Sequence, residues 1–439
     1  MKIPKHEPFR FKSSAELLQK AEALGVVLPF REDISTLFES ISIGSKSIPN
    51  RLVVQPMEGF DAEPDGSPGE LAYRRYRRYA EGGSGLVWSE ATSVVQTGRS
   101  NPRQLLITKK SLDGFKKLVE QTRKSASSSD LFLVLQITHS GRYARPEGKP
   151  RPQIPWPNPY LNKSDQRAVQ LSDDDLRQLR DFFVESFRLA KDAGFDAVDI
   201  KACHGYLIHE LLGASQRKNS RYGGSFVNRI RFLTEIVERG RHIVPDIAAA
   251  VRLSVTDNIP HPYGFGVPDD GSIRADLTEP IKLIERLIRI GCSLFNITVG
   301  NPYYSPHWVR PYDRPAECGN IPEEHPLQSI VRLIQATKEL QKTFPEIPLV
   351  GSGYSWLRRF FPHVGAAVIR SNAAHFIGLG RGMFAYPNIS KDLAETGSLN
   401  PKKVCIACSR CTELMRNDRI TGCVIHDKKI YGREYKKIK

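Results

Sequence analysis

The sequence predicts an α/β fold: a (β/α)8 barrel with a short N-terminal leader and a C-terminal cysteine-rich extension. Eight short apolar runs recur along the chain, and helix-length segments separate nearly all of them. The runs are continuously apolar rather than alternating, which is typical of parallel strands covered on both faces. Eight such units over roughly 350 residues suit a closed barrel with enlarged loops. An open doubly wound sheet is the runner-up, but no glycine-rich fingerprint follows the first run.

The expected elements follow the chain in order. The leader, residues 1–45, holds a short helix in SSAELLQKAEALG, capped by Ser13 or Ser14. The barrel is expected over 46–397 and the extension over 398–439. The loops 141–170 and 301–326 are too long for simple connections, so we predict lid or substrate loops there. Strands are expected at 52–55, 85–89, 131–138, 197–200, 248–253, 294–299, 348–351 and 375–380. Helices are expected at 71–80, 112–125, 173–193, 228–241, 279–290 and 326–342.

Composition limits the class of protein. The chain has 439 residues, of which 40% are hydrophobic and 26% charged, as in ordinary globular proteins. No apolar run approaches the roughly 20 residues of a membrane span. No apolar stretch follows the basic N-terminus as it would in a signal peptide. We therefore expect a cytoplasmic protein without a membrane partner, and a homo-oligomer is compatible with the sequence.

The chain is basic, with 64 Lys and Arg against 48 Asp and Glu and a net charge of +16. The charge is mostly dispersed, and it is densest in YRRYRRY, residues 73–79, and in the tail 428–439. We interpret both segments as solvated surfaces. A nucleic-acid partner ranks last, because the sequence shows no groove-entering element and no aromatic stacking platform.

Polar residues gather at the ends of the predicted strands. In barrels of this kind the active site lies at the C-terminal ends of the strands. The eight ends carry more ionisable and polar groups than a core built only for stability requires. These residues are Gln55, Glu58, Glu90, Gln136, His139, Lys201, His204, Arg252, Asn296, Thr298, Ser352 and Arg381.

The segment 195–237 is the most informative. Lys201, His204 and Tyr206 follow the strand expected at 197–200 and so lie above the barrel mouth. Lysine is a cation, histidine is a switchable donor, and tyrosine is a proton source that stays protonated at neutral pH. Together they suit a site that holds an electron-rich oxygen and delivers a proton nearby. From these three residues alone, a purely structural loop is equally compatible.

Seven motifs in chain order resemble the old yellow enzyme family, the FMN-dependent ene-reductases that share a (β/α)8 barrel. They are NRLVVQPMEGF, GLVWSEAT, LVLQITHSGRY, DIKACHGYLIHELL with RYGGSFVNRIRF, AAAVRLS and FIGLGRGMFAYPNI. The resemblance covers residues 50–390 or so. It implies that FMN is held by Pro56, Met57, Ala91, Gln136, Arg252, Gly353, Gly378, Gly380 and Arg381. Arg252 would lie near the flavin N1 and O2, where the reduced ring becomes anionic, and the last four residues would bind the phosphate.

The resemblance also implies catalytic roles. His204 would polarise the substrate carbonyl, and Tyr206 would protonate the carbon next to it, while hydride from flavin N5 reaches the β carbon. The family commonly has histidine at the position of Lys201. Lysine still donates hydrogen bonds, but as a flexible cation. This departure favours an acidic or thioester-bearing substrate, or a changed reaction.

Four cysteines near the C-terminus have the spacing C-x2-C-x2-C-x11-C: Cys405, Cys408, Cys411 and Cys423. The first three cysteines are closely spaced and suit one face of a cubane cluster, and the fourth completes its set of ligands. We therefore favour a 4Fe-4S cluster over zinc or free thiols. The branch of the family with 2,4-dienoyl-CoA reductase and trimethylamine dehydrogenase carries such a cluster after the barrel. No counterpart of the latter's flavin-linked cysteine is evident near Pro56, so we expect non-covalent FMN. Cys203, Cys292 and Cys318 indicate no more than core packing.

The leading hypothesis is an NAD(P)H:flavin oxidoreductase that reduces an activated alkene, such as an enoate, enone or enoyl thioester. No second nucleotide-binding module is evident, so electrons would come from NAD(P)H at the FMN or from a redox partner protein at the cluster. One alternative is an amine or C–H dehydrogenase that passes electrons outward through the cluster. Another is a flavin and iron–sulfur electron-transfer subunit with little turnover of its own.

Overall fold

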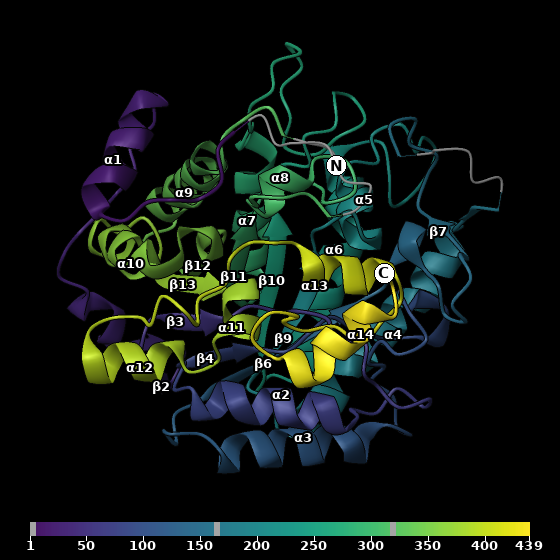
Figure 1. Cartoon of the computed structure of the whole chain (residues 1–439). Helices are drawn as coiled ribbons and strands as arrows, with labels where there is room; N and C mark the ends of the chain where they lie inside the picture. The colour runs from purple at the N-terminus through teal and green to yellow at the C-terminus, as the bar shows by residue number, and fades with distance from the viewer. Residues whose placement is uncertain (1–5, 162–166, 317–321) are drawn as a thin grey trace.

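The computed structural model describes residues 6–161, 167–316 and 322–439 (Figure 1). At its centre a ring of parallel strands follows sequence order, and pairings of β13 with β3 and of β4 with β6 complete it. The ring strands are β3 (Leu52–Val54), β4 (Leu86–Trp88), β6 (Phe132–Thr138), β9 (Ala197–Ala202), β10 (Ala248–Ser254), β11 (Cys292–Thr298), β12 (Leu349–Gly351) and β13 (Phe376–Leu379). The predicted (β/α)8 barrel is confirmed, and each expected strand overlaps an observed one.

Helices surround the ring (Figure 1). The expected ones are α2 (Glu70–Glu81), α3 (Leu112–Lys124), α4 (Asp173–Ala193), α6 (Phe226–Ile243), α7 (Thr278–Arg289) and α9 (Pro326–Thr343). Residue-level signals explain their ends: Ser172 and Asp175 form a capping box on α4, and Gly194 ends it in a left-handed conformation. The leader helix α1 (Ser14–Ala23) is capped by Ser13, whose side chain accepts from the Glu16 amide.

One barrel helix escaped the sequence analysis. Helix α10 (Phe361–Arg370) lies between β12 and β13 and follows the 3-10 turn η4 (Tyr354–Phe360). Its sequence, FPHVGAAVIR, contains a proline and a glycine, and seven of its ten residues are buried. A proline near the start and a glycine in the middle weaken the helical signal of so short a segment.

The two predicted lid loops contain short ordered elements. The first holds η3 (Gly141–Tyr143) and the parallel pair β7 (Gln153–Ile154) and β8 (Val169–Gln170). The second holds α8 (Pro306–Val309). Residues 162–166 and 317–321, with Cys318, lie outside the described ranges. Their role as lids stays a prediction.

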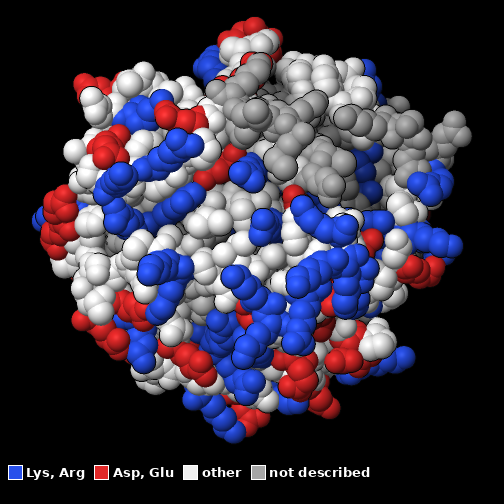
Figure 2. All heavy atoms as spheres, viewed as in Figure 1, with Lys and Arg blue, Asp and Glu red and all other residues white. Residues whose placement is uncertain are grey.

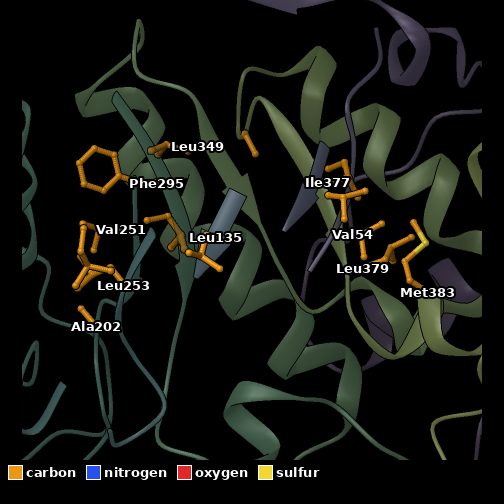
Figure 3. Close-up of a cluster of buried hydrophobic side chains, with 14 of the residues drawn as sticks. Val54, Leu135, Ala202, Val251, Leu253, Phe295, Leu349, Ile377, Leu379 and Met383 are labelled. Carbon is orange, nitrogen blue, oxygen red and sulfur yellow. The ribbon is translucent and has the colours of Figure 1, made fainter. Parts of the chain in front are cut away.

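Side chains alternate strictly along the ring strands. Leu52 and Val54 of β3 point to the helices, while Val53 points into the barrel. The outward residues join the core between barrel and helices, part of which Figure 3 shows. Inside, the lower half of the barrel is apolar and is closed by the hairpin β1 (Ile41–Ile43) and β2 (Lys46–Ile48), through Ile43 and Ile48.

The residues that point into the barrel change from apolar to polar about halfway along the strands. On β6 the inward residues run from Phe132 and Val134 to Gln136. On β10 an inward alanine, Ala250, is followed two residues later by Arg252. Because the side-chain period of a strand is two, these polar groups share the interior with the apolar layer below them. The fold therefore builds a polar floor at the C-terminal ends of the strands.

The extension packs on the barrel mouth, where it appears in yellow in Figure 1. It contains α13 (Arg410–Arg416) and α14 (Arg433–Lys436) and a small core that includes Leu414 and Tyr431. The Thr421 amide donates to the Gly59 carbonyl at 2.6 Å, and Asp427 accepts from Arg74 at 2.7 Å and Arg78 at 2.9 Å. Figure 2 shows Lys and Arg side chains gathered over this face.

These contacts correct the interpretation of YRRYRRY as a solvated face. Two of its arginines hold the extension, and a third, Arg75, is buried against Asp61 and Glu90. The tail is likewise partly packed, because Tyr431 and Tyr435 are buried. The domain boundaries at 45/46 and 397/398 stay predictions. No helix in the described ranges is long and apolar enough to cross a membrane.

We predict that Asp427→Ala loosens the extension. The change removes an acceptor shared by two guanidinium groups that are about one third exposed, so the loss is about 1 kcal/mol. Urea unfolding measures the stability, and limited proteolysis should cut between 398 and 439 faster than in wild type. Asp113→Ala removes an exposed ion pair on α3 and serves as the control. Equal cleavage of both variants would contradict the prediction.

Candidate active site

A cavity of about 1130 Å³, counting its open mouth, lies at the C-terminal ends of the strands. Residues from the ring strands, from the loop after β11 and from the extension line it together. All twelve residues expected to act in catalysis or flavin binding are among them: Pro56, Met57, Ala91, Gln136, Lys201, His204, Tyr206, Arg252, Gly353, Gly378, Gly380 and Arg381. Their individual roles stay predictions.

A buried carboxylate organises the floor of the cavity. Asp199 of β9 accepts from the Trp88 indole at 2.7 Å, from the Gln136 side-chain amide at 2.6 Å and from the Arg252 backbone amide at 2.5 Å. Burial raises the pKa of Asp199 to about 6, against these hydrogen bonds. The NH2 group of the Gln136 side chain therefore donates to Asp199. The side-chain oxygen of Gln136 receives no hydrogen bond from the described residues and is the part that can accept from a ligand.

Asp199 itself was missed by the sequence analysis. The signal was present, because an aspartate in the apolar strand AVDIKA requires buried partners. Beside this floor, Gln55 and Asn296 exchange hydrogen bonds at 3.1 and 2.8 Å. Both amides are therefore committed to each other and are structural parts of the floor.

Two arginines bring positive charge to the cavity without a carboxylate partner. Arg252 is buried, its Nε has no hydrogen-bond partner, and burial lowers its pKa. The Arg381 Nη2 donates to the Pro311 carbonyl at 2.6 Å, while its Nη1 is buried and unpaired. Within the described residues neither forms an ion pair. Buried cations of this kind call for an anionic ligand.

Three glycines border the cavity beside Arg381: Gly353, Gly378 and Gly380. A Cβ at Gly378 would collide with the Gln55 side chain at 2.0 Å, and Gly353 has a φ of +98° that disfavours other residues. Packing and backbone conformation therefore require glycine at Gly378 and Gly353. Cations and accessible backbone amides at the late strands of a barrel form a typical phosphate site.

The turn after β9 carries two side chains that can donate hydrogen bonds or protons, His204 and Tyr206. His204 is half-buried with a φ of +62°, and its Nε2 atom is buried without a hydrogen-bond partner. Burial, with the charges of Arg252 and Lys201, holds the pKa of His204 well below its usual value, so the ring is neutral at pH 7. Burial and the Glu58 charge hold the pKa of Tyr206 well above its usual value. Both side chains are therefore neutral hydrogen-bond donors.

Glu58 is a second residue whose role the sequence analysis missed. Its carboxylate oxygens lie 3.3 and 3.4 Å from the Tyr206 hydroxyl, and one of them accepts from the Gln104 amide at 3.1 Å. The Lys201 Nζ lies 3.7 Å from Glu58 and 3.7 Å from the centre of the Tyr206 ring. The sequence did contain a signal for this role, because the carboxylate of Glu58 directly follows Pro56 and Met57.

Two other strand-end residues do not face the cavity. Glu90 pairs with Arg75 and accepts from the Gly59 amide at 2.7 Å, and burial raises the pKa of Glu90 to about 7. It anchors the loop that carries Met57 and Glu58. His139 accepts from the Gly141 amide at 3.0 Å, and burial lowers its pKa to about 4. These two side chains are structural.

The four clustered cysteines line one pocket of about 350 Å³ beneath the extension: Cys405, Cys408, Cys411 and Cys423. All four are free thiols. Cys411 and Arg381 line both this pocket and the large cavity, so the two share a wall. Over the described part of the chain, no three Cys, His, Asp or Glu side chains are close enough to hold a single metal ion.

The fold and the place of the cavity define a barrel enzyme whose active site lies at the strand ends. Comparison with known proteins gives the family. The chain belongs to the NADH:flavin oxidoreductase / NADH oxidase family, whose model matches residues 36–266. The expected family is thus confirmed, and its iron–sulfur branch stays a prediction.

Individual relatives agree with this family. An NADPH dehydrogenase of Bacillus subtilis (strain 168) is 34% identical over 225 residues, which are 50% of this chain and 64% of that protein, less than two thirds of its length. A complex of 2-naphthoyl-CoA reductase with 2-naphthoyl-CoA has a TM-score of 0.73 at 21% identity, over 92% of this chain and 58% of the other. An old yellow enzyme homologue from Zymomonas mobilis has a TM-score of 0.64 at 23% identity, over 84% and 94%. The last two share the fold.

We predict that Arg252→Met weakens flavin retention, because the change removes the buried cation and keeps much of the side-chain volume. The dissociation constant for FMN should rise at least about tenfold, or ~1.4 kcal/mol. Quenching of flavin fluorescence measures it. Arg286→Met, on the outer face of α7 and partly exposed, is the control. Full FMN occupancy of the purified Arg252→Met variant would contradict the role of Arg252 in flavin binding.

Proposed function

We propose that the protein is an FMN-dependent oxidoreductase that reduces an activated C=C bond with electrons from NAD(P)H. The observation that carries the proposal is the convergence, in one cavity, of two neutral donors with two unpaired cations. His204 and Tyr206 lie on the turn after β9, and Arg252 and Arg381 belong to the same cavity wall. The first pair suits an enone or enoyl substrate, and the second suits a flavin and its phosphate.

The residues present fit FMN. Arg252 would face the side of the ring that becomes anionic, and the free oxygen of Gln136 would accept from the ring N–H. Gly353, Gly378 and Arg381 would hold the phosphate. When bound, FMN supplies hydride chemistry at N5. Family membership and the NADPH dehydrogenase relatives support NAD(P)H as the reductant.

The chain's own residues would polarise and protonate the substrate. His204 is neutral, so it donates one N–H to the substrate carbonyl oxygen, and Lys201 strengthens the local positive field. Negative charge then develops on that oxygen where donors are already in place. Tyr206 gives its hydroxyl proton to the carbon next to the carbonyl. Its raised pKa keeps that proton available throughout the ordinary pH range.

The charges around the cavity favour an anionic or thioester substrate. Arg310 borders the cavity and hydrogen-bonds the Thr412 hydroxyl at 3.0 Å. Burial and the nearby guanidinium groups of Arg381 and Arg416 lower the pKa of Arg310 to about 10. A cationic amine would enter this field at an electrostatic cost. The amine dehydrogenase alternative therefore ranks second.

We also propose a 4Fe-4S cluster on the four cysteines. In a zinc site four thiolates crowd around one ion at about 2.3 Å. In a cubane each thiolate binds a different iron, so the sulfurs lie further apart. Four free cysteines around one pocket, in the spacing C-x2-C-x2-C-x11-C, are the observation that supports the cluster. The wall shared through Cys411 would connect it to the flavin, and a redox partner protein could exchange electrons there.

We predict that Tyr206→Phe separates the two half-reactions. NADPH should reduce the flavin at nearly the wild-type rate, because no proton from Tyr206 is needed. Oxidation of the reduced enzyme by 2-cyclohexenone should slow about 100-fold or more, the usual contribution of a general acid. Stopped-flow absorbance of the flavin measures both steps. Unchanged turnover would exclude Tyr206 as the acid.

We predict that Cys408→Ser lowers the iron content well below four atoms per chain and removes broad absorbance near 400 nm, because one cluster ligand is lost. Colorimetric iron and sulfide assays on anaerobically purified protein provide the measurement. Cys203→Ser, a buried cysteine outside the pocket, is the matched control and should keep the iron. Normal iron in the Cys408 variant would rule out the cluster.

A further inference from the structure

Tyr206 has a proton to give but is buried, with a side chain that is 4% exposed. After it protonates a substrate, the tyrosinate has to be reprotonated before the next turnover. A buried tyrosinate is costly, as the raised pKa of Tyr206 indicates. A group beside the Tyr206 hydroxyl that passes on a proton from water would shorten the life of that tyrosinate.

Glu58 has that position. Both of its carboxylate oxygens lie within hydrogen-bonding range of the Tyr206 hydroxyl, at 3.3 and 3.4 Å. Glu58 also borders a second hollow, which we call the outer chamber. The outer chamber is about 980 Å³ and is lined by Tyr206 itself and by Ser100, Tyr143, Arg145, Tyr303 and Asp418 among others. Polar and charged groups of this kind hold water.

We propose that Glu58 relays protons from water in the outer chamber to Tyr206; the proposal rests on the proposed alkene reduction. In each turnover the Tyr206 O–H bond breaks and its proton goes to the substrate carbon. Glu58 takes one proton from water of the outer chamber and gives one to the Tyr206 oxygen. One solvent proton is consumed, and both side chains return to their starting state.

Lys201 supports the relay electrostatically. Its Nζ lies 3.7 Å from the Glu58 carboxylate and 3.7 Å from the centre of the Tyr206 ring. Glu58 is negatively charged before the transfer, and Tyr206 carries a second negative charge from the loss of its proton until Glu58 delivers one from water. Lys201 stays close to either position, so the ammonium group offsets the charge at every step.

The surroundings hold Glu58 in place for this task. The Gln104 amide donates to Glu58 at 3.1 Å and to the Ala91 carbonyl at 2.9 Å, which fixes the carboxylate against the cavity wall. The next residue, Gly59, is tied to the buried Glu90. Glu90 is paired directly with Arg75, as a purely structural carboxylate would be, whereas the cation nearest Glu58 stays 3.7 Å away.

Glu58→Gln tests the relay, since glutamine keeps the size and the hydrogen bonds but carries no transferable acid proton. The reduced holoenzyme is mixed with 2-cyclohexenone, and flavin oxidation is followed from about pH 6 to pH 9. Reduction by NADPH should stay within about twofold of wild type. Oxidation should slow at least about tenfold, and the slowing should grow with pH, because protons then come from bulk water. Glu58→Asp should restore part of the rate.

Controls separate the possible results. Glu63→Gln, an exposed glutamate of the same segment, should behave as wild type. Wild-type oxidation rate and pH profile in Glu58→Gln would overturn the relay while leaving the proposed function intact. A wild-type enzyme that NADPH reduces but no alkene reoxidises would overturn the proposed function itself.

If the Glu58→Gln variant loses its flavin, the Glu58→Asp variant tests the relay instead. Its carboxylate lies one methylene further from Tyr206. A slower oxidation with the wild-type pH profile supports the relay, and an unchanged rate overturns it.

Discussion

The site depends on one buried carboxylate at the level where the barrel interior turns from apolar to polar. Asp199 joins β9 to β4, β6 and β10 through Trp88, Gln136 and the Arg252 amide. These three hydrogen bonds set the height of the floor, the rotamer of Gln136 and the backbone from which Arg252 rises. Below them the interior is filled by apolar side chains and closed by the β1–β2 hairpin. At and above this level inward residues such as Lys201 and Arg252 line the cavity.

The strand ends could be predicted because they depend on local pattern. Continuous apolar runs fix the strands, and the period of two then places Gln136, Arg252 and Lys201 inside the barrel. Helix α10 was not predicted, since a proline and a glycine interrupt the helical pattern of its ten residues. Glu58 and Asp199 were visible as charged residues, but their roles depend on partners from distant segments, such as Gln104 and Trp88.

Charge was the least predictable property. The arginines of α2 form an obvious basic run, yet their acidic partners lie at Asp61, Glu90 and Asp427, far apart in the sequence. Similarly, the extension looks like a separate cysteine-rich tail. In the structure Cys411, Thr412 and Thr421 help to line the cavity. The cavity is therefore a joint product of the barrel and the extension.

Much of the extension is fastened by charged side chains that remain within reach of water. Arg74 and Arg78 hold Asp427, and Arg145 holds Asp418 at 3.1 Å, with exposed fractions near one third for the three arginines. Salt weakens such pairs, over a Debye length of about 8 Å at physiological ionic strength. The wall of the chamber is thus clamped by interactions that dissolved ions compete for, while the floor is not. Ionic strength becomes a means of loosening the roof of the site without disturbing its base.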